Sequence, residues 1–192
     1  RVLFRSEVAG EVEAVVVTHH HLDHTEAARA FAERMGCGVR GLDPAQCWRS
    51  EPLADGEVLS VGGLDVEVIT TPGHTTDSIS LVVDADGALL TGDMVLGRGT
   101  TVIVHPDGDL GSYFDSIARM RSLVTSGRVQ SLWPAHGPVL PDAAGVLDHY
   151  VVHRRERLAQ VEQALQRLGL SPAQLDRKST RLNSSHTDIS RM

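Results

Sequence analysis

The sequence contains few of the residues that would indicate a disulfide scaffold, a membrane anchor or a nucleic-acid-binding surface. Cys37 and Cys47 are the only cysteines among 192 residues, which excludes a disulfide-rich scaffold and predicts a cytoplasmic protein. No apolar run approaches the roughly 20 residues that span a bilayer, and no signal peptide is visible, so we expect no membrane partner. The formal net charge of −7 argues against broad attraction to nucleic acid.

Lysine and asparagine are missing from the body of the chain. The single lysine, Lys178, and the single asparagine, Asn183, both follow Leu175, whereas the body is rich in Ala, Gly, Val and Arg. Residues 1–6 and 176–192 resemble translated sequencing adaptor, read from opposite strands, and a genuine polar tail is the alternative. Without these ends the body becomes more acidic, because they carry more basic than acidic residues.

The densest group of possible metal ligands follows residues 13–17, a short apolar run typical of a buried strand. In an extended chain alternate residues share a side, so His19, His21 and Asp23 can converge while His20 and Leu22 point away. The turn into the next helix can then bring the imidazole of His24 to the same place. The run reads Thr18, His19, His20, His21, Leu22, Asp23 and His24.

Imidazole and carboxylate are ligand types of zinc, and this run holds too many for one tetrahedral ion that also keeps a water. We therefore interpret it as half of a two-metal site. An expression tag or a loose histidine tract is the alternative, but a tag does not follow a Val-rich strand.

The run resembles the His-x-His-x-Asp-His signature of the metallo-β-lactamase superfamily of hydrolases. That family carries further ligands in turns after later strands, and similar turns occur here at residues 72–75 (Pro-Gly-His-Thr), 92–93 (Gly-Asp) and 136–138 (His-Gly-Pro). Each alone could be an ordinary loop. The resemblance implies one metal held by His19, His21 and His74, a second held by Asp23, His24 and His136, and Asp93 bridging both.

The implied cofactors are two Zn²⁺ ions, and the carboxylate ligands leave iron or manganese open. Two cations stabilise hydroxide at neutral pH and polarise a bound carbonyl or phosphoryl oxygen. The resemblance gives Asp23 a catalytic role, which is to orient the metal-bound hydroxide. True β-lactamases of the superfamily have Cys or Ser where Asp93 stands, so antibiotic hydrolysis is disfavoured.

The segment after Asp93 resembles the lactamase-beta-2-like branch, and the resemblance covers most of residues 12–168. It implies an α/β fold, the metallo-β-lactamase αβ/βα four-layer sandwich, truncated at the N-terminus. We expect a metallo-β-lactamase domain at 7–140 that lacks its N-terminal strands. Residues 141–175 would form a C-terminal helix and the start of a truncated winged-helix-like domain.

Hydrophobic periodicity predicts where helices and strands lie. Ala28, Phe31, Ala32 and Met35 should mark the buried face of a helix at 25–35. Val146, Tyr150, His153, Leu158, Val161 and Leu165 form a similar stripe on a helix at 143–168. Strands are expected at 57–61, 64–69, 79–83, 88–90 and 129–133, the last of them buried, and a third helix at 113–123.

We therefore predict a hydrolase that cleaves a small-molecule ester, thioester or phosphodiester. Single-stranded RNA cleavage is an alternative, because Arg154, Arg155 and Arg157 could touch phosphate, although the acidic body does not favour it. A di-iron redox protein and an inactive fragment are alternatives of other classes. His149 and His153 lie one helical turn apart and could chelate a metal, but the ligand set elsewhere favours a surface role.

Overall fold

A computed structural model describes residues 12–170. The predicted adaptor-derived ends and residues 171–175 lie outside this range. The chain divides into two compact units, Arg1–Asp148 and His149–Met192, so the division falls within helix α4 (Ala143–Leu168). The candidate site lies in the first unit.

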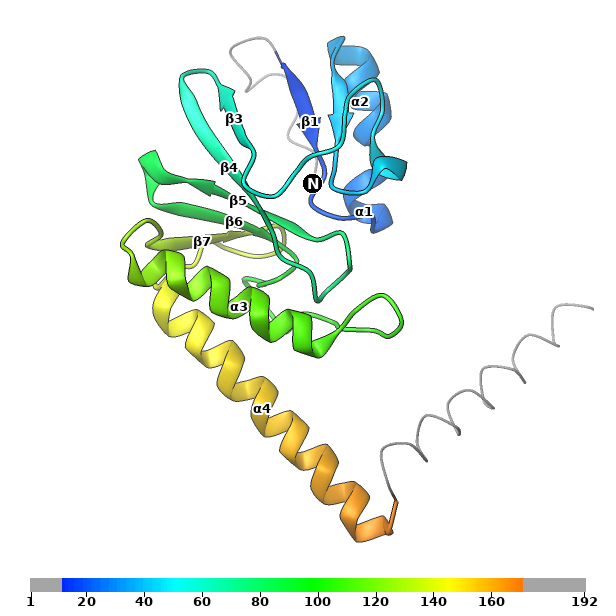
Figure 1. Cartoon of the computed structure of the whole chain (residues 1–192), viewed down its shortest axis with the longest axis vertical. Helices are drawn as coiled ribbons and strands as arrows, with labels where there is room; N and C mark the ends of the chain where they lie inside the picture. The colour runs from blue at the N-terminus through cyan, green and yellow to red at the C-terminus, as the bar shows by residue number, and fades with distance from the viewer. Residues whose placement is uncertain (1–11, 171–192) are drawn as a thin grey trace, which may run out of the picture. The chain divides into compact units, whose positions relative to one another are not determined.

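The N-terminal part of the first unit is a small parallel sheet covered by two helices (Figure 1). Strand β1 (Ala14–Val16) pairs with β2 (Gly38–Arg40), and helices α1 (Leu22–Thr25) and α2 (Ala28–Met35) connect them. The single helix expected at 25–35 is thus two helices. A short 3₁₀ turn, η2 (Pro44–Gln46), follows β2.

Helix α2 buries the face that periodicity predicted. Ala28, Phe31, Ala32 and Met35 are the residues of α2 that are not exposed, and Ala32 packs with Val17 and Val39 in one core cluster. The helix ends at Gly36, whose φ of 75° is the left-handed conformation that glycine adopts most readily. Strand β1 itself is only half buried, contrary to the expected buried strand.

The second sheet has five strands in the order β3-β4-β5-β6-β7. The first four pair antiparallel, and β6 and β7 pair parallel. The strands predicted at 57–61 and 64–69 form a hairpin, and Gly62 and Gly63, at φ 57° and 84°, make the turn between β3 and β4. The strands are β3 (Val58–Val61), β4 (Leu64–Thr70), β5 (Ile79–Val83), β6 (Ala88–Gly92) and β7 (Ser131–Pro134), with the 3₁₀ turn η3 (Asp84–Asp86) after β5.

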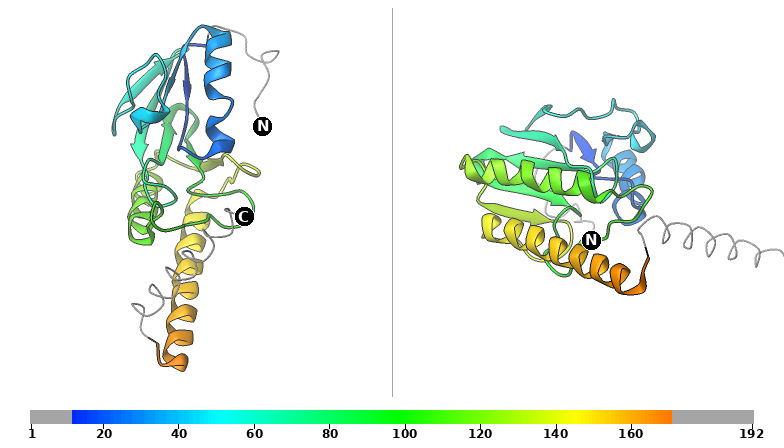
Figure 2. Two further views of the ribbon diagram at one scale, coloured as in Figure 1. Left: turned by 90° about the vertical axis from the view of Figure 1, so that its right-hand side faces the viewer. Right: turned by 60° about the horizontal axis from the view of Figure 1, so that its bottom comes forward.

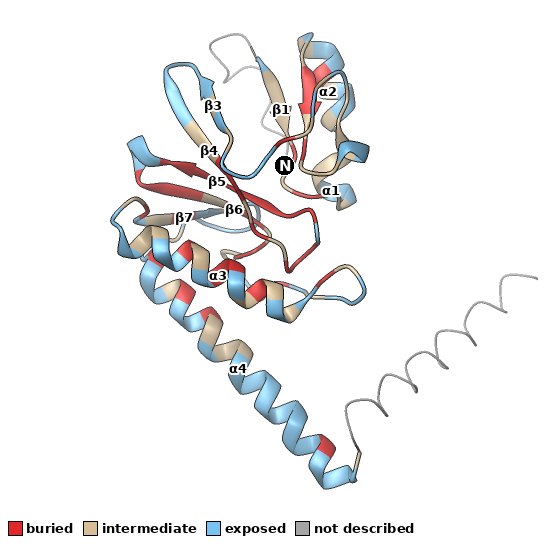
Figure 3. Ribbon diagram, viewed as in Figure 1, coloured by how far each residue is buried: buried red, intermediate tan, exposed pale blue. Residues whose placement is uncertain are grey.

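The two sheets face each other and helices cover their outer faces (Figure 2). Val16 of β1 packs against the buried Val68 and Ile79 of the larger sheet, and β5 is buried along its length (Figure 3). Helix α3 (Leu110–Thr125) lies on the far side, where Ser116 Oγ donates to Pro72 O at 2.7 Å. The layer order is helix, sheet, sheet, helix, which is an α/β fold.

Two packing expectations are wrong in part. Along α4, Leu158 and Val161 are 42% and 51% exposed, whereas Leu147, outside the predicted stripe, is fully buried. The strand expected at 129–133 is β7, whose Trp133 is 42% exposed. Within residues 12–170, no helix has the length and apolar character needed to cross a bilayer.

Candidate metal centre

The candidate ligands lie at the ends of strands from both sheets. The histidine run follows β1, His74 follows β4, Asp93 follows β6 and His136 follows β7. Backbone hydrogen bonds join these ends: Ile79 N donates to Thr18 O at 2.9 Å, and Gly97 N donates to His136 O at 2.7 Å. Segments far apart in the chain thereby meet at one edge of the two sheets.

Three imidazoles form what we call the inner triad, His19, His21 and His74. The Nε2 atoms of His19 and His74 each lie 3.0 Å from Nδ1 of His21. His19 and His74 are 1% and 7% exposed, so two of these rings are shielded from water. Three ring nitrogens aimed at one point provide one face of a coordination shell.

Asp23, His24 and His136 form the outer triad. His136 Nε2 lies 3.3 Å from both Asp23 Oδ2 and His24 Nε2, and His24 Nε2 lies 3.5 Å from Asp23 Oδ2. The side chains of Asp23 and His136 are 61% and 51% exposed. This half of the centre is therefore open to solvent, unlike the inner triad.

Asp93 lies between the two triads and presents a different oxygen to each. Its Oδ1 lies 3.4 Å from His24 Nε2 and 3.5 Å from His136 Nε2, and its Oδ2 lies 3.8 Å from His74 Nε2. Oδ1 is buried and has no hydrogen-bond partner. A buried carboxylate oxygen without a partner is costly, and a cation beside it would remove that cost. The residues present therefore fit a pair of metal ions.

Neighbouring groups orient the inner rings. The Nδ1 of His74 donates to Val102 O at 2.6 Å, which leaves its Nε2 lone pair facing the inner triad. Thr18 Oγ1 lies 3.1 Å from His19 Nδ1 and 3.5 Å from His24 Nδ1, so one hydroxyl contacts a ring of each triad. Such contacts fix the ring that would hold a metal.

The protonation states also suit cations. Burial, and then the charge of His24, lowers the pKa of His19 to about 3, and burial lowers the pKa of His21. Burial alone would raise the pKa of Asp93, but the imidazoles of His24, His136 and His19 hold it below its usual value. Neutral imidazole and ionised carboxylate are the forms that bind metals.

The structure thus brings together all seven residues predicted as ligands, although the reason given for Asp23 was wrong. The chain is not extended there, because α1 begins at Leu22, and Asp23 and His24 lie within that helix. Leu22 points away as expected, at 76% exposed. Their assignment as metal ligands stays a prediction.

Sequence reasoning missed Asp107, which belongs to a group of side chains around His20. The Nδ1 of His20 lies 2.9 Å from Asp77 Oδ1 and its Nε2 lies 3.5 Å from Asp107 Oδ2. Asp77 therefore contacts His20 and not one of the seven predicted ligands. Among the described residues, His20, His21 and Asp107 form a further group that could hold a metal ion. No motif marks Asp107, and only the fold reveals its place.

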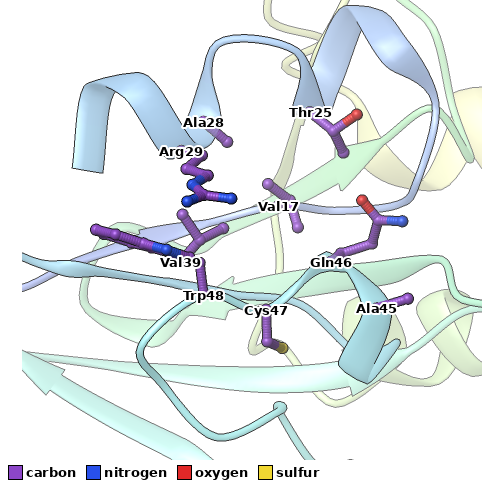
Figure 4. A pocket seen from close by; sticks show the side chains of 9 residues that line it. All are labelled: Val17, Thr25, Ala28, Arg29, Val39, Ala45, Gln46, Cys47 and Trp48. Carbon is purple, nitrogen blue, oxygen red and sulfur yellow. The ribbon is translucent and has the colours of Figure 1, made fainter. Parts of the chain in front are cut away.

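A pocket of about 190 Å³ lies elsewhere, between α2 and the loop after β2. In it the Arg29 guanidinium lies 5.4 Å from the centre of the Trp48 ring (Figure 4). Cys47 lines this pocket, but it belongs to none of the candidate metal groups among the described residues. The pocket therefore lacks the ligand set found at the strand ends.

The layered α/β fold and a carboxylate shared by two triads define a metallo-β-lactamase type of protein. A model of the metallo-beta-lactamase superfamily matches residues 9–126, and the chain belongs to this superfamily, as the sequence predicted.

Known proteins show the same relationship. The chain is 34% identical over 164 residues to an atrochrysone carboxyl ACP thioesterase of Aspergillus fumigatus, covering 82% of this chain and 48% of that protein. It is 30% identical over 167 residues to a beta-lactamase-like protein 2 homolog of Drosophila melanogaster, covering 79% and 54%. The chain spans about half the length of these curated relatives.

A solved structure supports the fold. A beta-lactamase domain protein from Burkholderia ambifaria superimposes with a TM-score of 0.68 at 25% identity, over 80% of this chain and 58% of that one. The α/β metallo-β-lactamase fold is thus supported by both the sequence and the structure comparisons.

Proposed function

We propose that the protein is a metal-dependent hydrolase that holds two divalent cations, preferably zinc, and cleaves an ester, thioester or phosphodiester. The observation that carries this proposal is Asp93, whose two oxygens face different triads while Oδ1 has no hydrogen-bond partner. A carboxylate placed in this way can serve two cations at once.

The inner triad would hold one ion, the outer triad the other, and Asp93 both. Such a pair supplies a nucleophile from water at neutral pH and polarises the bond to be cleaved. His74 and His19 are kept in place by Val102 O and Thr18 Oγ1. The exposed carboxylate of Asp23 lies on the open side, where it can orient water.

The thioester option draws support from a relative. The Aspergillus fumigatus protein is named an ACP thioesterase, and 82% of this chain aligns with it. RNA cleavage, which Arg154, Arg155 and Arg157 suggested, is the weaker alternative, because the net charge of the chain is −7.

Hydrolysis after metal reconstitution tests the proposal. The full chain, stripped with chelator and reloaded with zinc, iron or manganese, would be assayed with p-nitrophenyl acetate, a short acyl thioester and bis(p-nitrophenyl) phosphate. We expect zinc to restore turnover of at least one substrate, Asp93→Ala to abolish it, and the exposed-turn control Asp86→Ala to retain it. Folded, zinc-loaded chain without turnover of any of the three would refute the hydrolase proposal.

A further inference from the structure

A pocket of about 270 Å³ opens beside the inner triad. Its lining includes His21 and His74 of the inner triad and the apolar side chains of Val102, Val104 and Pro106. Small-molecule sites typically measure about 300–1,000 Å³, so this pocket suits a group of several carbon atoms. Its position places such a group next to the candidate cleavage site.

The apolar side of the pocket is exposed yet held in place. Val102 and Val104 are each 62% exposed, which is unusual for two valines so close in sequence. The loop that carries them is fixed near Val102, where Val102 O accepts from His74 Nδ1 at 2.6 Å. It is fixed again at Asp107, whose Oδ1 accepts from Thr76 N at 3.1 Å and from Thr76 Oγ1 at 2.8 Å.

These hydrogen bonds tie the apolar loop to the turn that presents His74. Asp109 N also donates to Gly73 O at 3.0 Å, one residue before that histidine. The valines are therefore positioned relative to the metal centre before any substrate arrives. A preformed apolar surface loses little conformational entropy when it binds an acyl chain.

Apart from the metal centre beside it, the pocket offers no arginine or lysine to an anionic group among the described residues that line it. Of those residues, His20 and His105 are histidines and Asp107 is a carboxylate. Burial alone would raise the pKa of Asp107, but its hydrogen bonds from Thr76 hold the pKa below the usual value, so the carboxyl is ionised at neutral pH. Phosphate sites generally use arginine or lysine, and a carboxylate would repel a phosphodiester.

We propose that Val102, Val104 and Pro106 form a subsite for an uncharged, apolar acyl group, which makes the substrate an ester or thioester of a medium-length acyl chain. This inference rests on the proposed hydrolase function and narrows its range of substrates to esters and thioesters. The phosphodiester substrates left open above are then disfavoured by the pocket itself.

Chain-length preference tests the subsite. With zinc-loaded full chain, kcat/KM should rise about tenfold or more from p-nitrophenyl acetate to p-nitrophenyl hexanoate, because each buried methylene adds binding in an apolar pocket. Val104→Ser should reduce this preference to about twofold or less while acetate turnover remains. Val152→Ser, at an exposed valine of α4, is the matched control and should keep the preference.

Binding without turnover gives a separate measurement. In NMR spectra of the chain with labelled methyl groups, hexanamide should shift the Val102 and Val104 methyl signals, whereas acetamide should not. Hexanamide is not expected to be consumed during the measurement, so this result does not require an active enzyme.

The outcomes distinguish this inference from the proposed function. An active enzyme whose kcat/KM does not change with acyl chain length, and whose Val102 and Val104 methyl signals do not shift with hexanamide, would overturn the subsite. The hydrolase proposal would then still stand. Preference for bis(p-nitrophenyl) phosphate over all esters would also overturn it. Hexanamide shifts at both valines in a chain that hydrolyses nothing would support the apolar site while the hydrolase proposal fails.

Discussion

The inner and outer triads use similar ligand types in different surroundings. His19 and His74 of the inner triad are almost fully buried, whereas Asp23 and His136 of the outer triad are more than half exposed. The inner rings are fixed by backbone and hydroxyl partners, and the outer triad has its carboxylate on a helix of four residues. We therefore expect the inner triad to hold its ion more tightly and the outer ion to exchange faster.

The largest effect should come from removing the residue that both triads share. Asp93→Ala should lower the affinity for both ions by about 100-fold or more, because each ion loses a ligand. The difference in affinity between the inner and outer triads should then disappear. Equilibrium dialysis with elemental analysis measures this, with Asp86→Ala as the control. Two tightly held ions in Asp93→Ala would show that Asp93 does not bridge.

Single substitutions in each triad should act unequally. His136→Ala should leave one tightly bound zinc per chain, because the inner triad remains complete. His74→Ala should weaken the tighter of the two binding steps by about 100-fold or more, because losing a ligand costs more than the roughly 10- to 100-fold typical of losing a group that only orients one. Isothermal titration of both variants compares them directly, and equal losses from the tight step would contradict the inner and outer distinction.

The Thr18 hydroxyl contacts one ring of each triad, at 3.1 Å from His19 and 3.5 Å from His24. Thr18→Val keeps the shape and removes the hydrogen bond, so we expect about tenfold weaker binding, mainly at the inner triad where the contact is shorter. Thr125→Val, at the exposed end of α3, is the control. A metal titration in which Thr18→Val loses more affinity at the outer triad than at the inner triad would contradict this prediction.

A charge cluster remote from both triads should affect stability and leave metal binding unchanged. Arg128 donates to Glu67 at 2.6 Å and to Asp84 at 2.7 Å, and its hydrogen bond lowers the pKa of Asp84. A carboxyl with a depressed pKa in the folded state stabilises the fold above its unfolded pKa, near 3.8, and this contribution is lost as the pH falls below that value.

Arg128→Met should therefore reduce the free energy of unfolding at pH 7 by about 0.5–1 kcal/mol, a small value because these side chains are partly exposed. The difference from the original chain should shrink toward pH 3. Urea denaturation of metal-free chain at several pH values measures it. A difference that stays constant from pH 7 to pH 3 would exclude this charge cluster as the cause.

The strand-end pattern allowed the inner triad and Asp93 to be located from sequence, because a motif resemblance places ligands in turns after strands. The contacts made by residues next to the ligands could not be predicted. His20 and Asp77 are 57 positions apart, and Thr76 and Asp107 are 31 apart, so only tertiary packing brings them together. The prediction of a buried stripe along α4 was wrong at Leu158 and Val161, which are exposed. Helical periodicity indicates which residues share a face of the helix, but not whether another part of the chain covers that face.

Asp23 shows how a correct residue can follow from an incorrect reason. An extended chain would have placed it beside His19 and His21, but helix α1 turns it toward His24 and His136. The helix begins three residues earlier than the sequence pattern indicated, since the pattern marked only its apolar face. The division into inner and outer triads depends on that local turn.

Zinc titration of the metal-stripped full chain, followed by elemental analysis after gel filtration, tests the two-ion centre most directly. We predict two binding steps that reach about two zinc ions per chain, with the tighter step retained in His136→Ala. Folded chain that binds a single ion, or two ions unaffected by Asp93→Ala, would contradict the two-metal centre.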